Sequence, residues 1–293
     1  MNITPTSERR DFAAEITGID LRNPASPDLL AAIEAAMNQY AVVVIRDQKF
    51  NDDQQYAFAA AMGPIEPTPA VIEGHKHRLK HAAMVDISNL DMDGSVMKTD
   101  DRRRMFNLGN LLWHSDSSFK PTPAKHSMLH AREIPPSGGE TQFADMRAAY
   151  DALSAEHKAR IENLVCDHSL IYSRSQLGFD AFKPEELVEF TPVPQRLVRR
   201  HPGSGRRSIY LSAHIGTIQG WLRPEAMCYI RDLTEHATQP QFVYTHEWRL
   251  HDMVIWDNRC TMHRARPFDD RKYKRDMRRM TLEDSAPTLA QPA

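Results

Sequence analysis

Three residues far apart in the chain have the types that could together hold a metal ion: His114, Asp116 and His263. Two imidazoles and one carboxylate bind one face of an iron(II) ion and leave the opposite face open for other ligands. Side chains two positions apart in a strand point the same way, so we expect His114 and Asp116 to reach the same ion. His263 must then come from a distant part of the fold. The sequence therefore predicts an open-faced iron(II) site.

Two arginines follow the last of these histidines, in a segment (275–282) that is predicted to be a strand. Arg275 and Arg279 then lie on one face of that strand, together with Met277 and Thr281. A guanidinium holds a carboxylate through two parallel hydrogen bonds. If this face looks into the metal site, the arginines predict two acidic ligands, a co-substrate and a substrate. The alternative is an exposed basic strand, since further cations are close by: Arg271, Lys272, Lys274 and Arg278.

The composition is that of an ordinary soluble globular protein, with 41% hydrophobic and 26% charged residues among 293. A formal charge of −2 gives no electrostatic reason to expect nucleic acid or a membrane surface as a partner. Three scattered cysteines, and a start that lacks the pattern of a signal peptide, predict reduced thiols and a cytoplasmic protein. The longest aliphatic run, 41–45, is far too short to cross a membrane and predicts a buried strand.

The elements that must position these residues are mostly short strands. The chain opens with a predicted strand, helix, strand and helix at 12–21, 26–38, 40–46 and 52–62. The first helix begins with Ser26 as its cap and Pro27 at its first position. Further strands are predicted at 111–116, 125–132, 140–145, 166–172, 196–201, 208–212, 241–246, 253–257, 261–265 and 276–283, with helices at 146–153, 155–164 and 224–237 and a loop at 173–189.

This pattern predicts a mostly β fold with helical inserts: a double-stranded β-helix (jelly roll, cupin-like) with flanking helices. A doubly wound parallel sheet is the alternative, but it needs regular alternation of strands and helices, which the C-terminal half does not show. We expect one domain over residues 1–284 and a frayed tail at 285–293. The irregular, proline-containing segment 64–107 just before the metal residues predicts a lid over the site.

Three motifs resemble the taurine/2,4-dichlorophenoxyacetate dioxygenase family of iron(II)- and 2-oxoglutarate-dependent oxygenases. They are LWHSDSSF at 112–119, GGETQFADMRAAYDAL at 138–153 and WDNRCTMH at 256–263, and the likeness extends over nearly the whole chain, 3–283. The second and third motifs resemble the phenoxyacetate branch of the family more than the taurine branch.

The resemblance implies a role for each matching residue. His114, Asp116 and His263 would bind iron(II), and Thr141 and Arg275 would hold the distal carboxylate of 2-oxoglutarate, with dioxygen as the other co-substrate. Substrate would be bound by four residues: Arg279, which would hold its acid group, and Ser117, His201 and His214 beside it. Relatives of this kind are often dimers or tetramers, so a homo-oligomer is also expected.

The implied reaction is oxygen insertion next to the ether oxygen of an aryloxyalkanoate, such as 2,4-dichlorophenoxyacetate, which releases a phenol and glyoxylate with succinate and carbon dioxide. The same chemistry on an alkyl sulfonate or sulfate ester is an alternative. A zinc hydrolase could use the same triad, but it gives no reason for two inward arginines and lacks an obvious general base. A non-catalytic barrel that binds a small acid is the third possibility.

Overall fold

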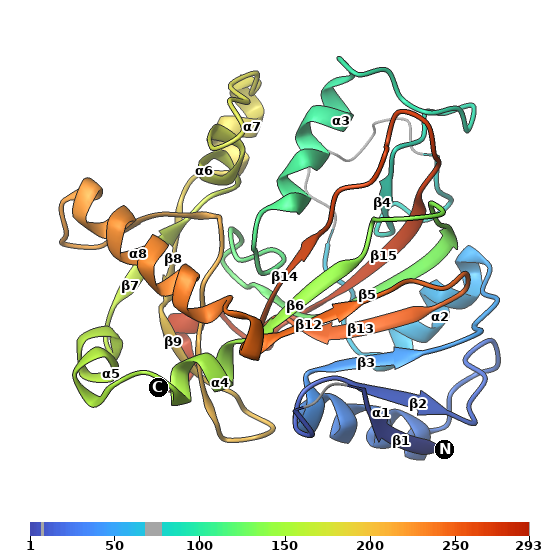
Figure 1. Ribbon diagram of the computed structural model, residues 1–293, viewed down its shortest axis with the longest axis horizontal. Helices are drawn as coiled ribbons and strands as arrows, with labels where there is room; N and C mark the ends of the chain where they lie inside the picture. Colours follow the sequence, from blue (N-terminus) through green and yellow to red (C-terminus); the bar gives the residue numbers. More distant parts are fainter. Residues whose placement is uncertain (7–8, 68–77, 293) are drawn as a thin grey trace.

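A seven-stranded sheet forms the scaffold of the computed structural model, which describes residues 1–6, 9–67 and 78–292 (Figure 1). The β2 and β3 strands run parallel, and the other neighbours in this sheet are antiparallel. In spatial order the strands are β1 (Asn2–Pro5), β2 (Ala14–Thr17), β3 (Val42–Ile45), β13 (Met253–Asp257), β5 (Ala124–Glu133), β15 (Asp276–Glu283) and β4 (Val85–Ser88).

A three-stranded sheet packs against the inner face of the large sheet. It consists of β12 (Val243–His246), β6 (Thr141–Asp145) and β14 (Thr261–Ala265), in that spatial order. Phe143 of the small sheet shares one buried cluster with Leu129, Val254, Trp256 and Met277 of the large one. Two facing, mostly antiparallel layers around one core are typical of a jelly roll. The predicted mostly β jelly roll with flanking helices is confirmed.

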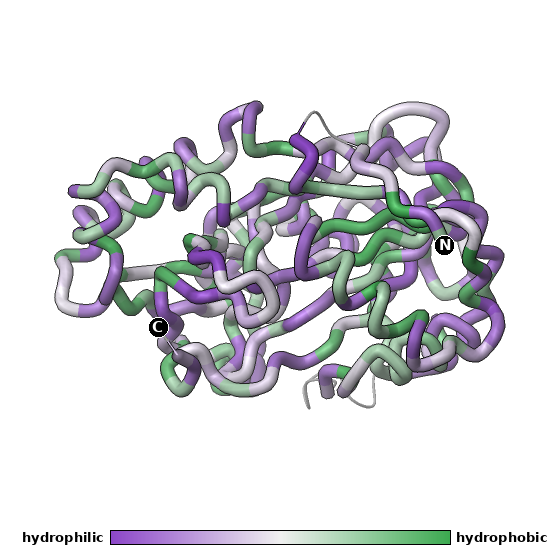
Figure 2. The backbone as a smooth tube through the Cα atoms, turned by 90° about the horizontal axis from the view of Figure 1, so that it is seen from below, coloured by the Kyte–Doolittle hydropathy of each residue, from purple (hydrophilic) through white to green (hydrophobic). Residues whose placement is uncertain are grey.

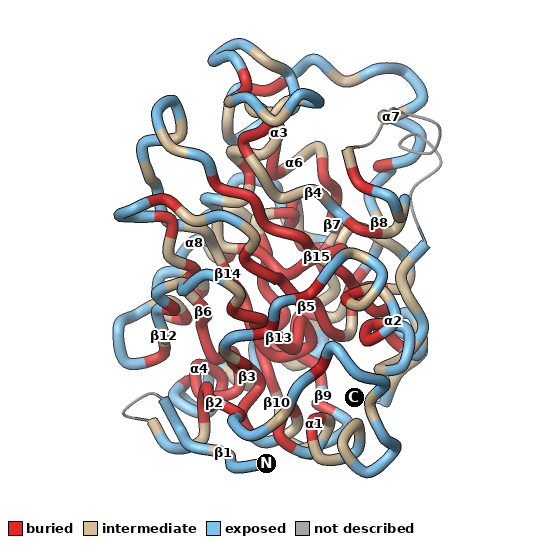
Figure 3. The backbone as a smooth tube through the Cα atoms, turned by 90° about the vertical axis from the view of Figure 1, so that its right-hand side faces the viewer, coloured by how far each residue is buried: buried red, intermediate tan, exposed pale blue. Residues whose placement is uncertain are grey.

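Two helices cover the outer face of the large sheet: α1 (Pro27–Tyr40) and α2 (Asp52–Met62). The alternation within β3 explains why, because Val43 and Ile45 pack toward the helices while Val42 and Val44 join the inner cluster. Ser26 caps α1 by accepting a 3.2 Å hydrogen bond from the backbone of Leu29, as predicted. The central strands β5, β13 and β15 are consequently buried on both faces (Figure 3).

The opposite end of the molecule is a smaller layer of strands and helices (Figure 1). Its core joins α4 and α8 to the strands β7, β9, β10 and β11. The strands predicted at 196–201 and 208–212 are present in part, as the antiparallel pair β9 and β10. The elements of this layer are α4 (Met146–Asp151), α5 (Ala155–Ile161), β7 (Val165–His168), β8 (Val193–Arg196), β9 (Val198–Arg200), β10 (Arg207–Ile209), β11 (Ile215–Ile218), α8 (Arg223–Ala237) and the short helix η2 (Pro240–Phe242).

The strand predicted at 111–116 is wrong. A short 3-10 helix, η1 (Leu108–Leu111), ends there, and His114 forms an isolated one-residue bridge with His263. The chain turns directly after this bridge, with Ser117 in the left-handed region at φ +52°. The side chains of His114 and Asp116 still converge, but a bridge followed by a turn brings them together.

The elements predicted between 166 and 189 are also wrong in part. The β7 strand ends at His168 because Ser169 caps a helix, α6 (Leu170–Ser175), by accepting a hydrogen bond from the backbone of Ile171. A second helix, α7 (Pro184–Glu189), occupies the region expected to be a loop. Ser169 and Pro184 are ordinary helix-start signals, and six-residue helices are too short to show a periodic apolar pattern.

The C-terminal tail is not frayed over 285–292, contrary to expectation. A 3-10 helix, η3 (Thr288–Ala290), packs beside β8, and the buried Thr288 hydroxyl donates to Gln195 at 2.6 Å. Gln291 accepts a 2.7 Å hydrogen bond from Arg199. The tail is therefore part of the folded unit. Hydrogen bonds hold it in place, although its sequence has no periodic apolar pattern.

The described part of the expected lid includes the edge strand of the large sheet. Its elements are β4, which pairs with β15, and α3 (Arg102–Asn107). Residues 68–77 of this segment lie outside the described residues, so the lid stays a prediction. Figure 2 shows the apolar stretches concentrated along the central strands. Within the described ranges, no helix is long and apolar enough to cross a membrane.

Candidate active site

The backbone brings the two candidate histidine ligands together. His263 lies on β14, where β6 holds it opposite Phe143. His114 and His263 exchange backbone hydrogen bonds of 3.0 and 2.8 Å, and their ring centres lie 4.2 Å apart. Ser115 fixes the segment between the ligands, because its hydroxyl donates to the carbonyls of Leu211 and Thr261.

The side chains of His114, Asp116 and His263 form a compact, buried group. One ligand atom of each lies within 4.8 Å of the others. The Nε2 atoms of His114 and His263 lie 3.8 and 3.7 Å from the two carboxylate oxygens of Asp116. His114 Nδ1 lies 2.8 Å from the carbonyl of Leu112, so Nδ1 carries the proton and Nε2 keeps a lone pair for a metal. This donor set fits a divalent ion bound on one face.

Two residues behind the group hold Asp116 in place. The Asn258 amide donates to the Ser127 hydroxyl at 2.9 Å, and Ser127 donates to Asp116 Oδ2 at 2.7 Å. Asn258 Oδ1 also accepts the backbone N–H of Asp116 at 3.1 Å. Such partners orient a metal ligand and tune its basicity. Neither residue has a role that the sequence predicts, although Asn258 lies within the third motif.

The charges around the group keep the ligand atoms in the forms that bind metals. Burial alone would raise the pKa of Asp116, but the charge of Arg279, together with the two histidines in their protonated forms, lowers it to about 2. Arg279 contacts the Asp116 carboxylate directly. Burial lowers the pKa of His114, and it lowers that of His263 well below the usual value. The site therefore holds a carboxylate and two neutral imidazoles at neutral pH.

A small hollow opens beside the two histidines, lined among others by Thr141, Arg275 and Arg279. Arg275 is buried, and its guanidinium donates to the carbonyl of Gly139 at 3.3 Å. Burial lowers its pKa to about 10, and no acidic partner for it is found among the described residues. A buried cation without a counter-charge is unfavourable unless an anion joins it. The hollow therefore suits a ligand with a carboxylate.

The position of Arg275 depends on Asn89, a residue that the sequence analysis did not single out. The Asn89 side chain accepts the backbone N–H of Arg275 at 2.8 Å and donates to the carbonyls of Asp270 and Tyr273. The residue just beyond β4 thus anchors the loop that carries the arginine. A lone asparagine in an irregular segment gives no sequence signal for such a contact.

A wider cavity of about 230 Å³ adjoins the hollow and shares Arg275 with it. The expected lid segment contributes part of its wall, including Ile87 and Asn89. Its apolar lining includes Leu108, Leu111, Pro267 and Phe268. Together, the hollow and the cavity offer a cationic end at Arg275 for an acid group and an apolar wall for the rest of a ligand.

His214 and Ser117 lie next to the metal ligands, while their contact with substrate stays a prediction. The ring centre of His214 lies 6.1 Å from that of His114 and 4.9 Å from that of Phe119. Its Nδ1 lies 2.9 Å from the hydroxyl of Ser173. Ser117 directly follows Asp116 and is buried.

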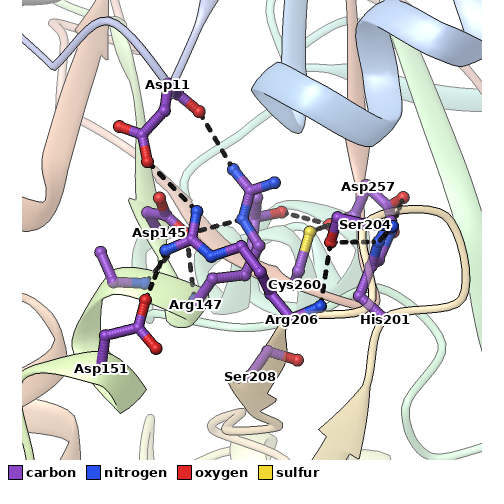
Figure 4. Close-up of polar contacts among 12 residues, drawn as sticks. Asp11, Asp145, Arg147, Asp151, His201, Ser204, Arg206, Ser208, Asp257 and Cys260 are labelled. Atoms are coloured by element: carbon purple, nitrogen blue, oxygen red, sulfur yellow. Dashed lines mark hydrogen bonds and ion pairs between the residues drawn. The ribbon is translucent and has the colours of Figure 1, made fainter.

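His201 corrects an expectation, because the structure does not bring it to the metal group. Its two ring nitrogens bond to Ser204 and Asp257 at 2.9 Å each, which leaves neither for a substrate (Figure 4). Cys260 completes a second group that could in principle hold a metal. However, Arg259 donates to both oxygens of Asp257. This carboxylate is saturated, so the group is a structural core.

Comparison with known proteins agrees with the geometry. The model of the "Taurine catabolism dioxygenase TauD, TfdA family" matches residues 2–281. The chain belongs to this family. Among family members it is similar to the alpha-ketoglutarate-dependent 2,4-dichlorophenoxyacetate dioxygenase of Cupriavidus pinatubonensis, with 42% identity over 94% of this chain and 96% of that relative. The (S)-phenoxypropionate/alpha-ketoglutarate-dioxygenase of Sphingobium herbicidovorans is 38% identical over 88% and 87%.

The solved structures point to the same family. The crystal structure of AAD-2 in complex with Mn(II) and N-oxalylglycine is 50% identical, with a TM-score of 0.92 over 99% of this chain and 100% of that chain. The resemblance stated from the three motifs, including the phenoxyacetate branch, is confirmed.

Proposed function

We propose that this protein is an iron(II)- and 2-oxoglutarate-dependent dioxygenase that hydroxylates an aryloxyalkanoate, such as 2,4-dichlorophenoxyacetate, next to its ether oxygen. The products are a phenol, glyoxylate, succinate and carbon dioxide. The observation that carries the proposal is a His–Asp–His group that shares one hollow with a buried, unneutralised arginine, Arg275. The names of the relatives support the same substrate class.

His114, Asp116 and His263 would hold the iron, since their donor atoms converge and are in the correct protonation states. When bound there, iron(II) supplies the oxidative chemistry, in which dioxygen is divided between a substrate C–H bond and the decarboxylation of 2-oxoglutarate to succinate. Ser127 and Asn258 would keep the carboxylate ligand oriented.

Arg275 and Thr141 would hold the distal carboxylate of 2-oxoglutarate. Arg275 supplies a desolvated guanidinium, and both residues line the hollow beside the histidines. Trp248 donates to the Thr141 hydroxyl at 3.0 Å, which leaves the hydroxyl proton free to donate to a carboxylate. The pair thus offers two donors to one acid group.

Arg279 would hold the acid group of the substrate. Because Arg279 also contacts Asp116, a carboxylate bound to it lies beside the metal ligands, with the carbon next to that carboxylate close to the reacting site. Hydroxylation of this carbon gives a centre with a hydroxyl and an aryl ether oxygen. Such a hemiacetal divides into a phenol and an aldehyde, which for an aryloxyacetate is glyoxylate.

The wider cavity favours an aromatic substrate over a small alkyl sulfonate. Its volume of about 230 Å³ and apolar lining suit a ring, whereas a short alkyl sulfonate would leave Leu108, Leu111 and Phe268 without a partner. The same chemistry on an alkyl sulfonate or sulfate ester stays the alternative.

A panel of acids tests the proposal. Iron(II)-loaded protein with 2-oxoglutarate is given 2,4-dichlorophenoxyacetate, each enantiomer of an aryloxypropionate, an alkyl sulfonate and an alkyl sulfate, and released phenol, sulfite or sulfate is measured with succinate. The proposal expects phenol and succinate in equal amounts from at least one aryloxyalkanoate. Release of sulfite or sulfate alone would overturn the substrate, and absence of succinate would overturn the reaction class. A dimeric or tetrameric, cytoplasmic enzyme stays a prediction, which light scattering and cell fractionation would check.

A further inference from the structure

A second buried arginine, Arg174 on α6, lies near the site and has no role in the account above. Its side chain is inside the protein, with only 7% of the residue exposed. The guanidinium carbon lies 4.3 Å from the centre of the Phe106 ring, and Nη1 donates to the Ser173 hydroxyl at 3.0 Å. The backbone of Gly109 also lies against this guanidinium, because an added Cβ there would fall 2.3 Å from Nη1. The guanidinium thus packs against the Phe106 ring and against the backbone of Gly109, which has no side chain.

The charge of Arg174 has no counter-ion among the residues that the structure describes. Its Nε is buried without a hydrogen-bond partner. Burial, and then the charge of Arg279, lower the pKa of Arg174 to about 10, so the side chain stays cationic at neutral pH. An unpaired buried cation is strongly unfavourable, and a methionine could fill the same space against Phe106 without that penalty.

Neighbours of Arg174 connect this charge to the metal group and to the hollow. Ser173, which accepts from Arg174, also contacts His214, and the His214 ring lies 6.1 Å from that of His114. Gly109 directly precedes Asn110, which lines the hollow that contains Arg279. Arg279 itself is partly neutralised by Asp116. A substrate acid on Arg279 therefore lacks a full counter-charge unless a second cation contributes.

We propose that Arg174 is a specificity-determining residue that binds the carboxylate of the substrate together with Arg279. The inference rests on the proposed function, since it assumes an acidic substrate at Arg279. With both guanidinium groups, the site selects acids over neutral analogues of the same shape. Glycine is required at position 109, because any side chain there would displace the guanidinium of Arg174.

Calorimetry on protein loaded with Mn(II) and N-oxalylglycine tests this without turnover. The probes are 2,4-dichlorophenoxyacetate and its neutral amide, titrated into wild-type protein, Arg174→Met and Arg102→Gln. We expect Arg174→Met to raise the Kd of the acid by about tenfold or more and to leave the Kd of the amide and of N-oxalylglycine unchanged. Arg102→Gln is the matched control, because Arg102 lies over the neighbouring Phe179 ring but is exposed.

Two further variants keep the test decisive if Arg174→Met folds poorly. Arg174→Lys keeps the charge and should recover part of the affinity for the acid. Gly109→Ala keeps the arginine but displaces it, and should weaken the acid selectively. The inference would be overturned if wild type, Arg174→Met and Gly109→Ala bound the acid with equal affinity. It would also be overturned if a variant lost the same affinity for the acid as for the amide, or if wild-type protein bound neither probe. Phenol release by wild-type enzyme is measured separately, so failure of the proposed function is seen independently.

Discussion

Asp116 has more partners than metal binding alone requires. It accepts from Ser127, contacts Arg279 and has its backbone held by Asn258. We expect Asn258→Ala to weaken metal binding by about 10–100-fold, because the Ser127 hydroxyl and the Asp116 backbone both lose their partner. Anaerobic titration with iron(II) measures this. An unchanged affinity in the folded variant would show that Asn258 supports the core alone.

Arg275 is the residue on which binding of the co-substrate depends. Arg275→Met should weaken 2-oxoglutarate by about 2–5 kcal/mol, because the distal carboxylate would be buried without its counter-charge. The KM for 2-oxoglutarate in succinate formation is the measurement, and Arg271→Ala, an exposed neighbour on the same loop, is the control. A normal KM in the Arg275 variant would mean that another cation holds this carboxylate.

The β7 strand ends in a buried histidine, His168, that should make the free energy of unfolding fall at acidic pH. His168 packs on the ring of Tyr210, and burial lowers its pKa to about 3 from an ordinary 6.5. As the pH falls, His168 takes up a proton near pH 6.5 in the unfolded chain but only near pH 3 in the folded protein. Its contribution to stability is therefore complete above pH 6.5 and is lost as the pH falls, by about 1.4 kcal/mol per pH unit.

The variant His168→Gln should remove this contribution. Urea unfolding between pH 4 and 7 should show a shallower loss of stability in the variant than in wild type, while His157→Gln, at an exposed position on α5, should follow wild type. Parallel curves for wild type and His168→Gln would contradict the assignment.

The elements that the sequence predicted well are those with strong periodic patterns or clear caps. The run 41–45 became β3, and Ser26 with Pro27 began α1. Short elements were missed, because α6 and α7 have six residues each and leave no periodic pattern to detect. The pattern at 111–116 predicts a strand where the structure has a one-residue bridge, since the two look alike in sequence.

At the scale of the whole molecule, the jelly roll and its metal group were predictable, while contacts between distant loops were not. The His–Asp–His set has fixed residue types, so its pattern could be recognised in the sequence. Arg275 lies just before β15 and Arg279 lies within it, and both line the hollow as the predicted strand pattern indicated. His201 was misplaced because a histidine before a turn looks the same whether it faces substrate or a buried aspartate.

The tail is a further whole-molecule feature that sequence did not reveal. Thr288 bonds to Gln195, which donates to the carbonyls of Ser118 and Lys120 in the turn after Asp116. We expect Thr288→Val to reduce the free energy of unfolding by about 1–3 kcal/mol, because it leaves buried polar groups unsatisfied. Denaturant unfolding checks this, and a value equal to that of wild type would contradict the contact.

We expect one metal ion to be bound by His114, Asp116 and His263. Anaerobic calorimetric titration of metal-free protein with iron(II) tests it most directly, on wild type, His114→Ala, His263→Ala and His201→Asn. This ligand set predicts one ion per chain in wild type and in His201→Asn, and loss of that ion in the other two variants. It would be contradicted if His114→Ala and His263→Ala bound iron as wild type does, or if His201→Asn alone lost it.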